Sequence, residues 1–316
     1  MERIPKPKHG SKEWLLTRWK DDLGRCVFGA SDIPALMNAS PYKTRAELFA
    51  DKLNEPQEQV ESAIFRRGNL LEKPLLLAAS DQLGVELFTP DTIYRDGRLS
   101  VSLDGVSRSL TKPELVVEAK TTTRYSIYDQ NDLPTEWCWQ GWAQQAVLDC
   151  PVWFSVLDRD LKISVVELPR NEAAIDALRL ETEVFGEWVD NNTPPLDEIN
   201  NFSADDIARI WRATPTMVEL DATAAQLVID LEKARATSKE ASDAEARLKD
   251  ALAQMMLNHE IGMFNGQKII SWTQQAGKKA LDTARLRADH PELVKQYEKQ
   301  GNPYRVMRTH REKAKK

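Results

Sequence analysis

Residues 115–120 read LVVEAK, an apolar run that ends in a carboxylate and an ammonium two positions apart. The run is short and rich in valine, which is typical of a buried β-strand. Side chains two apart on a strand point to the same side. Glu118 and Lys120 are therefore predicted to lie together at the end of this strand, where it leaves the core.

A second carboxylate ends another run of the same kind. Residues 101–105 read VSLDG, in which Asp104 precedes a glycine that permits a tight turn. If the two strands are neighbours, Asp104 meets Glu118 and Lys120. The same residues also fit a structural interpretation, with Asp104 forming the turn and Glu118 and Lys120 forming an ion pair on an edge strand.

Two carboxylates beside a lysine suit phosphodiester hydrolysis. Asp104 and Glu118 would hold one or two Mg²⁺ ions, which prefer oxygen ligands, and the backbone carbonyl of Ala119 is a further candidate ligand. Such ions stabilise the attacking and leaving oxygens of an in-line displacement. Lys120 would orient or help deprotonate the attacking water and offset the developing charge. We expect Mn²⁺ to be able to replace Mg²⁺.

A similar spacing at Asp160 and Lys162 falls in a predicted turn between two strands. Side chains in such a turn are expected to face solvent, so this pair is not a candidate for catalysis.

The composition is that of a globular protein long enough for one large domain or two ordinary ones, with 316 residues of which 41% are hydrophobic. No apolar run approaches the ~20 residues that span a bilayer, and the N-terminal residues lead into no apolar signal stretch. We therefore expect a cytoplasmic protein without a membrane partner. Three widely spaced cysteines and four scattered histidines argue against a disulfide framework and a zinc site.

The order of the predicted elements favours a mixed α/β fold with a small central sheet flanked by helices. Strands are predicted over 87–94, 98–103, 114–120, 152–157 and 162–168. Helices are predicted over 11–20, 44–53, 60–82, 134–149 and 171–190, and the first two start at Ser11 and Thr44, with a glutamate shortly after each.

A boundary is predicted near Pro194 and Pro195, beyond which the pattern changes. We expect a linker and a long helix over 201–258, in which apolar residues recur every seven positions, from Leu220 and Leu227 to Leu248 and Met255. This seam can pair within the chain or with another copy of it. An Asn-Gly pair after the helix predicts a hairpin.

The charge of the chain is uneven. Residues 259–316 carry 13 lysines and arginines against 6 acidic residues, whereas the whole chain has a net charge of −6. This basic C-terminal segment suits a protein that meets DNA locally. A solvated basic tail without a partner fits the charge equally well.

Several short motifs follow one another between residues 25 and 145. They are FGASD (28–32), RGNLLE (67–72), SLDG (102–105), EAK (118–120) and PTEWCWQ (134–140). In this order they resemble segments of the lambda-exonuclease and YqaJ-type nucleases, phage recombination enzymes of the PD-(D/E)xK superfamily. The resemblance implies a restriction-endonuclease-like core, a nuclease domain over 1–200 and a helical C-terminal extension.

The resemblance also implies roles for further residues. Glu72 would be another carboxylate near the metals, and Gln140 would sit beside the catalytic lysine and position water or phosphate. Ser31 would contact the phosphate at the DNA end together with an arginine. Arg25 is the nearest arginine in the sequence, and Arg18 is the alternative.

Each of these residues has a structural alternative. Glu72 can be an exposed helix residue, Gln140 a polar residue in a tryptophan-rich packing helix, and Ser31 a helix N-cap. Trp137, in the same helix, can stack on a base or belong to the core. The sequence departs from the family at Leu103, where the family has proline.

The resemblance implies an exonuclease that degrades the 5′-ended strand of linear duplex DNA and leaves single strands for phage-type recombination. Its gene would belong to a phage or prophage in a bacterial host. Duplex DNA ends and a single-strand annealing protein are the implied partners, and a homo-oligomer is left open. Two alternatives remain: an endonuclease with the same metal centre, and a non-catalytic DNA-end-binding or scaffold protein.

Overall fold

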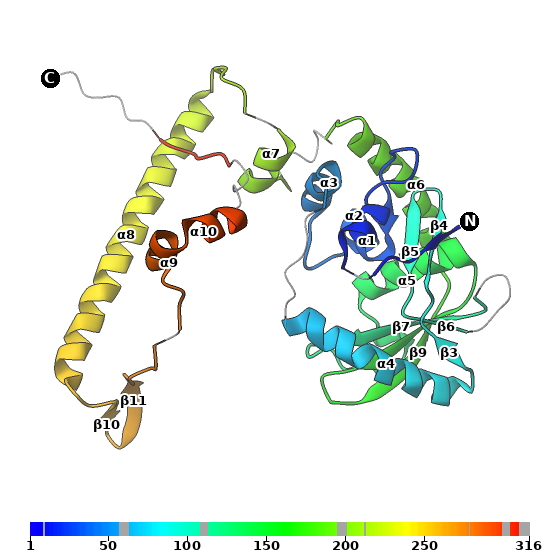
Figure 1. The fold of residues 1–316 in the computed structure, drawn as a ribbon, viewed down its shortest axis with the longest axis horizontal. Helices are drawn as coiled ribbons and strands as arrows, with labels where there is room; N and C mark the ends of the chain where they lie inside the picture. The colour runs from blue at the N-terminus through cyan, green and yellow to red at the C-terminus, as the bar shows by residue number, and fades with distance from the viewer. Residues whose placement is uncertain are drawn as a thin grey trace. The chain divides into compact units, whose positions relative to one another are not determined.

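The computed structural model describes residues 1–8, 10–56, 63–107, 113–194, 201–211, 213–277, 279–298 and 304–309. The chain forms two compact units, Met1–Arg212 and Ala213–Lys316 (Figure 1). Pro195 of the predicted boundary lies outside the described residues, and so do Lys278, 299–303 and 310–316 of the basic segment. No helix within the described ranges is long and apolar enough to cross a membrane.

The first unit has the predicted mixed α/β fold. Its helices are α1 (Lys12–Thr17), α2 (Ile33–Leu36), α3 (Arg45–Leu53), α4 (Ala63–Leu83), α5 (Thr135–Leu148), α6 (Glu172–Asp190) and α7 (Ala204–Ile210). Short 3₁₀ turns, η1 (Ala30–Asp32) and η2 (Gln130–Asp132), precede α2 and α5.

The strands of this unit divide between two sheets. The first contains β1 (Glu2–Pro5), β4 (Thr92–Asp96), β5 (Leu99–Ser102) and β2 (Phe28–Gly29), in that order. The second contains β3 (Leu87–Phe88), β6 (Gly105–Ser107), β7 (Val116–Thr121), β8 (Val152–Leu157) and β9 (Ile163–Leu168). The β2–β5 and β7–β8 pairs are parallel and the others are antiparallel. The chain crosses from one sheet to the other between β5 and β6.

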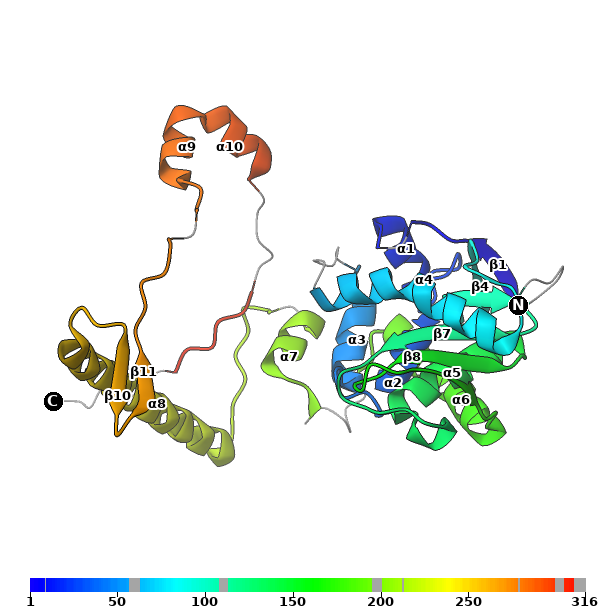
Figure 2. The same ribbon diagram turned by 90° about the horizontal axis from the view of Figure 1, so that it is seen from below.

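Helices cover both faces of the second sheet, with α4 on one face and α5 on the other (Figure 2). Val117 of β7 packs with Leu76 and Ala79 of α4, whereas Val116 belongs to the larger core with Ala143 of α5. Because side chains alternate along a strand, Glu118 and Lys120 follow Val116 onto the α5 side.

Helices α1 and α3 begin at the capping residues that the sequence predicts, Ser11 and Thr44. The Ser11 hydroxyl accepts a hydrogen bond from the Trp14 N–H. At α3, Thr44 and Glu47 form a reciprocal capping box, each side chain accepting from the other residue's N–H. Each cap of this kind contributes about 1 kcal/mol to stability.

The second unit contains the predicted long helix, α8 (Ala222–Met256), followed by β10 (Ile261–Phe264), β11 (Gln267–Ser271), α9 (Thr283–Asp289) and α10 (Pro291–Tyr297). The predicted hairpin turn is present, with Asn265 at φ 49° and Gly266 at φ 76°. Both residues tolerate this left-handed backbone, which explains the Asn-Gly pair. Met256 is buried at the end of α8.

Candidate active site

Asp104 lies at the crossing between the two sheets, next to the strand that carries Glu118. β6 pairs with β7, and Gly105 stands opposite Val117. The Asp104 Oδ2 atom accepts a hydrogen bond from the Ala119 N–H at 3.0 Å. A Cβ atom on Gly105 would lie 2.4 Å from a methyl group of Leu76 in α4, so the glycine allows the helix to approach closely.

Glu118, Lys120 and Gln140 form a closed set of contacts. The Lys120 ammonium donates to Glu118 Oε1 at 2.9 Å and to Gln140 Oε1 at 2.8 Å. The Gln140 amide N–H in turn donates to Glu118 Oε1. Glu118 is only 5% exposed. Because the lysine is held from two sides, its ammonium is fixed at the end of β7.

The carboxylate of Asp104 carries an electrostatic cost. Its burial, and then the negative charge of Glu118, raise the pKa of Asp104 well above its ordinary value, although the Lys120 charge opposes the shift. One lysine therefore does not balance the acidic groups at this site. A further cation would stabilise the ionised form.

Glu72 lies on α4, half-buried, within electrostatic range of the same centre. Burial and the charge of Glu118 raise the pKa of Glu72, whereas Lys6 and Lys73 lower it. Among the residues whose positions are described, no three His, Cys, Asp or Glu side chains converge closely enough to form a complete metal-binding cluster. Two carboxylates, with Glu72 nearby, are thus the acidic groups that the fold brings together.

Two further residues reach this centre that are not among those predicted from the sequence. Gln144, fully buried on α5, donates its amide N–H to Glu118 Oε2 at 2.7 Å. Its spacing of four from Gln140 on one helix is a signal that the sequence contains. Lys6 directly follows β1, and its ammonium donates to the Leu103 carbonyl oxygen at 3.4 Å. No local pattern connects Lys6 with a residue 97 positions away.

A second cluster gathers around Ser31. The Arg18 guanidinium donates to the Ser31 hydroxyl at 2.5 Å and lies 4.5 Å from the Trp14 ring. A Cβ atom on Gly29 would lie 2.5 Å from the Arg18 Nη2 atom, so the glycine of the FGASD motif makes room for the guanidinium.

Arg25, the arginine nearest to this motif in the sequence, is not brought to Ser31. Its guanidinium pairs with Asp21 at 2.8 Å. Ser31 is also not a helix N-cap, because it lies within η1 and its hydroxyl accepts from Arg18. Arg18, the other arginine that the sequence offers, therefore occupies the position next to Ser31.

Asp32, next to Ser31 in the sequence, binds the backbone of the same motif and a lysine of α3. Its carboxylate accepts from the Gly29 N–H at 2.9 Å and from the Lys52 ammonium at 2.7 Å. Burial raises the pKa of Asp32, but the charges of Lys52 and Arg18 outweigh it and lower the pKa to about 2. The pair with Lys52 therefore holds the motif in place.

The tryptophans of α5 pack within the domain. Trp137 stacks on Phe154 with an interplanar angle of 26° and meets Tyr125 edge-on. Trp139 and Trp142 meet edge-on at 5.1 Å. These contacts favour the core interpretation over a platform for bases.

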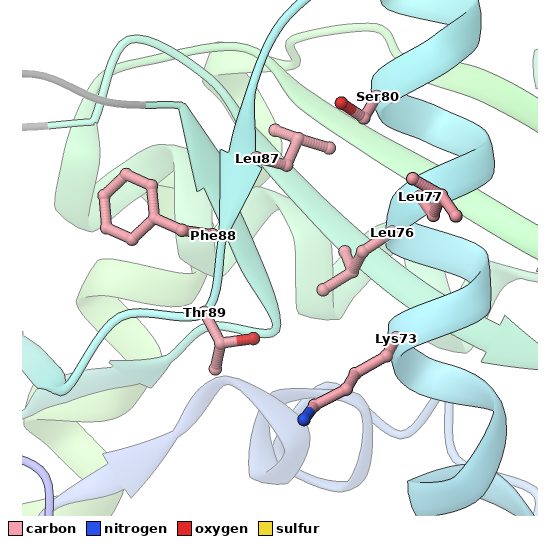
Figure 3. A pocket seen from close by; sticks show the side chains of 7 residues that line it. All are labelled: Lys73, Leu76, Leu77, Ser80, Leu87, Phe88 and Thr89. Carbon is pink, nitrogen blue, oxygen red and sulfur yellow. The ribbon is translucent and has the colours of Figure 1, made fainter.

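A hollow of about 240 Å³ lies between α4 and the edge strand β3. Figure 3 shows residues of α4 on one side and of β3 with Thr89 on the other. Its lining residues are Lys73, Leu76, Leu77, Ser80, Leu87, Phe88 and Thr89. None of them is one of the candidate catalytic or phosphate-binding residues.

Comparison with known families gives a match to the model of the YqaJ-like viral recombinase domain over residues 13–151. This part of the chain, less than half of its 316 residues, is therefore similar to that family. The matched segment includes Arg18 and Ser31 of one cluster and Asp104, Glu118 and Lys120 of the other. The uncharacterized protein YqaJ of Bacillus subtilis (strain 168) is 23% identical over 303 residues, which cover 91% of each chain.

Solved structures similar to this chain include the alkaline exonuclease LHK-Exo from Laribacter hongkongensis, at 16% identity and a TM-score of 0.43. The similarity covers 58% of this chain and 94% of that one. A structure of LHK-Exo in complex with dAMP has a TM-score of 0.42. A phage related exonuclease from Haemophilus somnus 129PT, at 12% identity and a TM-score of 0.40, matches over 54% of this chain and 96% of its own.

Proposed function

We propose that the chain is a Mg²⁺-dependent DNA exonuclease that degrades the 5′-ended strand of linear duplex DNA and leaves single strands for phage-type recombination. The observation that carries the proposal is the meeting of Asp104, Glu118 and Lys120 at one end of β7. It is supported by the similarity of residues 13–151, which include all three, to the YqaJ-like viral recombinase domain.

The acidic residues fit a hard divalent cation. Asp104 and Glu118 offer carboxylate oxygens within electrostatic range of each other, and the raised pKa of Asp104, caused by burial and by Glu118, reflects negative charge that one lysine does not balance. Asp104, Glu118 and the Ala119 carbonyl would hold Mg²⁺ or Mn²⁺, with Glu72 as a further carboxylate nearby. The cation would supply Lewis-acid stabilisation of the phosphoryl oxygens.

Lys120 and Gln140 would act on the water and on the phosphate. In hydrolysis the water oxygen forms a bond to phosphorus while the bond from phosphorus to the leaving oxygen breaks. The Lys120 ammonium, fixed by Glu118 and Gln140, would donate hydrogen bonds to the attacking water or to the phosphate oxygens. Gln140 would keep Lys120 in this orientation.

Arg18 and Ser31 would bind the 5′-phosphate at the DNA end. A guanidinium and a hydroxyl 2.5 Å apart can both donate to one phosphate group, and Ser31 is exposed. The Arg18 guanidinium is oriented by the Trp14 ring. In this proposal Arg18 takes the role that the sequence position first suggested for Arg25.

The remaining parts of the chain would serve DNA and protein partners. We assign the chemistry to a nuclease domain over 1–200, a linker and long helix to 201–258, and DNA contact to the basic segment 259–316. Leu227 and Leu248 are exposed on α8, where a homo-oligomer could form. A single-strand annealing protein would receive the exposed strand.

The proposal is tested by digestion of a 5′-end-labelled linear duplex with and without Mg²⁺, beside a closed circular duplex. We expect Mg²⁺-dependent release of nucleotides from the linear DNA and no nicking of the circle. Nicking of the circle would identify an endonuclease. Binding without any cleavage would identify a non-catalytic DNA-end-binding protein.

A further inference from the structure

Both oxygens of Glu118 are held by neighbouring side chains. Oε1 accepts from Lys120 at 2.9 Å and from Gln140. Oε2 accepts from Gln144 at 2.7 Å. Gln140 and Gln144 lie one helical turn apart on α5. One face of this helix therefore contacts both oxygen atoms of the Glu118 carboxylate.

Packing alone does not explain a glutamine at position 144. The side chain is fully buried, and its Oε1 atom has no hydrogen-bond partner among the residues described. A buried carbonyl without a partner costs folding free energy that an apolar side chain of similar size would avoid. What Gln144 provides in return is the N–H donor to Glu118.

The next residue offers a natural comparison. Gln145 is 2% exposed, and its Oε1 atom likewise has no partner within the described chain. Its amide N–H, however, donates to the Leu168 backbone carbonyl at 3.0 Å. Two adjacent glutamines thus have the same chemistry and burial, but of these two it is Gln144 that contacts the candidate active site.

We propose that Gln144 is a positioning residue for the divalent cation, because it fixes the rotation of the Glu118 carboxylate. The inference rests on the proposed function, in which Glu118 is a cation ligand. The terminal torsion of a glutamate is soft, so contacts at Oε1 alone leave the carboxylate plane free to turn. The bond at Oε2 removes that freedom and sets which lone pairs face the cation.

The test is Mn²⁺ binding in the absence of DNA, measured by electron paramagnetic resonance and by calorimetry, for the wild type, Gln144→Met and Gln145→Met. Methionine is unbranched and similar in length, so both variants fill the space without an amide. Loss of an outer contact to a ligand typically weakens metal binding by about 10–100-fold, so we expect at least about tenfold for Gln144→Met and less than about twofold for Gln145→Met. Thermal unfolding should shift by similar amounts in the two variants.

The inference is overturned if Gln144→Met binds Mn²⁺ as tightly as the wild type, or if both variants weaken binding equally. If Gln144→Met does not fold, Gln144→Asn replaces it. The asparagine keeps a buried amide, but its side chain is one methylene group shorter, so the N–H donor no longer reaches Glu118 Oε2. The same loss of Mn²⁺ affinity is expected. A wild type that binds no divalent cation would instead remove the proposed metal function itself.

Discussion

Lys120 donates to Glu118 across 2.9 Å at the end of β7, and the same ammonium also donates to Gln140. The Lys120 side chain is only partly buried, with 21% of it exposed. Its removal should therefore affect chemistry far more than folding.

Lys120→Ala should lower the rate of DNA cleavage by about 10²-fold or more, because a positioned general acid–base group contributes this much. The measurement is single-turnover digestion of a labelled duplex at saturating Mg²⁺. Lys162→Ala is the matched control, since Lys162 also follows an acid at a spacing of two but lies exposed near the β8–β9 turn. A Lys120→Ala rate above about a tenth of the wild type would contradict the assignment.

Asp104→Asn should abolish cleavage and yet stabilise the cation-free protein. Burial and the Glu118 charge disfavour the ionised Asp104 carboxylate, and asparagine removes that charge while keeping an acceptor for the Ala119 N–H. Thermal unfolding checks this in EDTA and in Mg²⁺. Mg²⁺ should raise the Tm of the wild type and leave that of Asp104→Asn nearly unchanged. An Asp104→Asn protein less stable than the wild type in EDTA would speak against the electrostatic cost.

The placement of Glu118 and Lys120 on one side of β7 could be predicted because it depends on a local rule, the spacing of two along a strand. Asp104 approaches them in a different way from the one expected: the strand that ends before Asp104, β5, lies in the other sheet, and it is β6, directly after Asp104, that pairs with β7. The long helices and the Asn265–Gly266 hairpin were predictable for the same reason, since their signals lie within a few residues.

Contacts between distant segments could not be read from local patterns. Lys6 approaches Leu103 because β1 pairs with β4, and a four-residue strand carries too little periodicity to be recognised. The division into two sheets has the same origin, because the short strands β2 and β6 lack a distinct pattern. Likewise, sequence distance favoured Arg25 over Arg18, whereas the local ion pair with Asp21 holds Arg25 away from Ser31.

Asp32→Asn should reduce the stability of the first unit near neutral pH by about 2 kcal/mol, judged from the lowered pKa. A carboxyl group with a depressed folded-state pKa contributes stability above its unfolded pKa and loses it as the pH falls toward 2. The difference between wild type and variant should therefore be full above about pH 5 and shrink below it. Urea unfolding across this range measures it, with the exposed Asp22→Asn as control. A difference that does not change with pH would argue against the Lys52 pair as its source.

Replacing Arg285, Arg287, Arg305 and Arg308 with alanine should weaken DNA binding and flatten its dependence on salt. All four are exposed in the basic segment, and each phosphate contact contributes about 0.9 to the slope of log affinity against log salt. Substitution is preferable to deletion of 259–316, which would remove the hairpin that follows the buried Met256. Lys239→Ala and Arg247→Ala, exposed on α8, are the controls. An unchanged slope in the fourfold variant would show that the segment is not a DNA contact.

The Ser31 cluster should make the enzyme prefer a 5′-phosphorylated duplex end over a 5′-hydroxyl end. Arg18 and Ser31 present a guanidinium and a hydroxyl together, and a terminal phosphate can accept from both. Initial rates on matched 5′-phosphate and 5′-hydroxyl duplexes measure the preference. Arg18→Ala and Ser31→Ala should each reduce it about tenfold, the expected loss for a charge-assisted hydrogen bond of ~1.5 kcal/mol. Arg25→Ala should leave it unchanged, because Arg25 is paired with Asp21. Equal rates on the two ends, or a preference that survives Arg18→Ala, would leave the phosphate site without support.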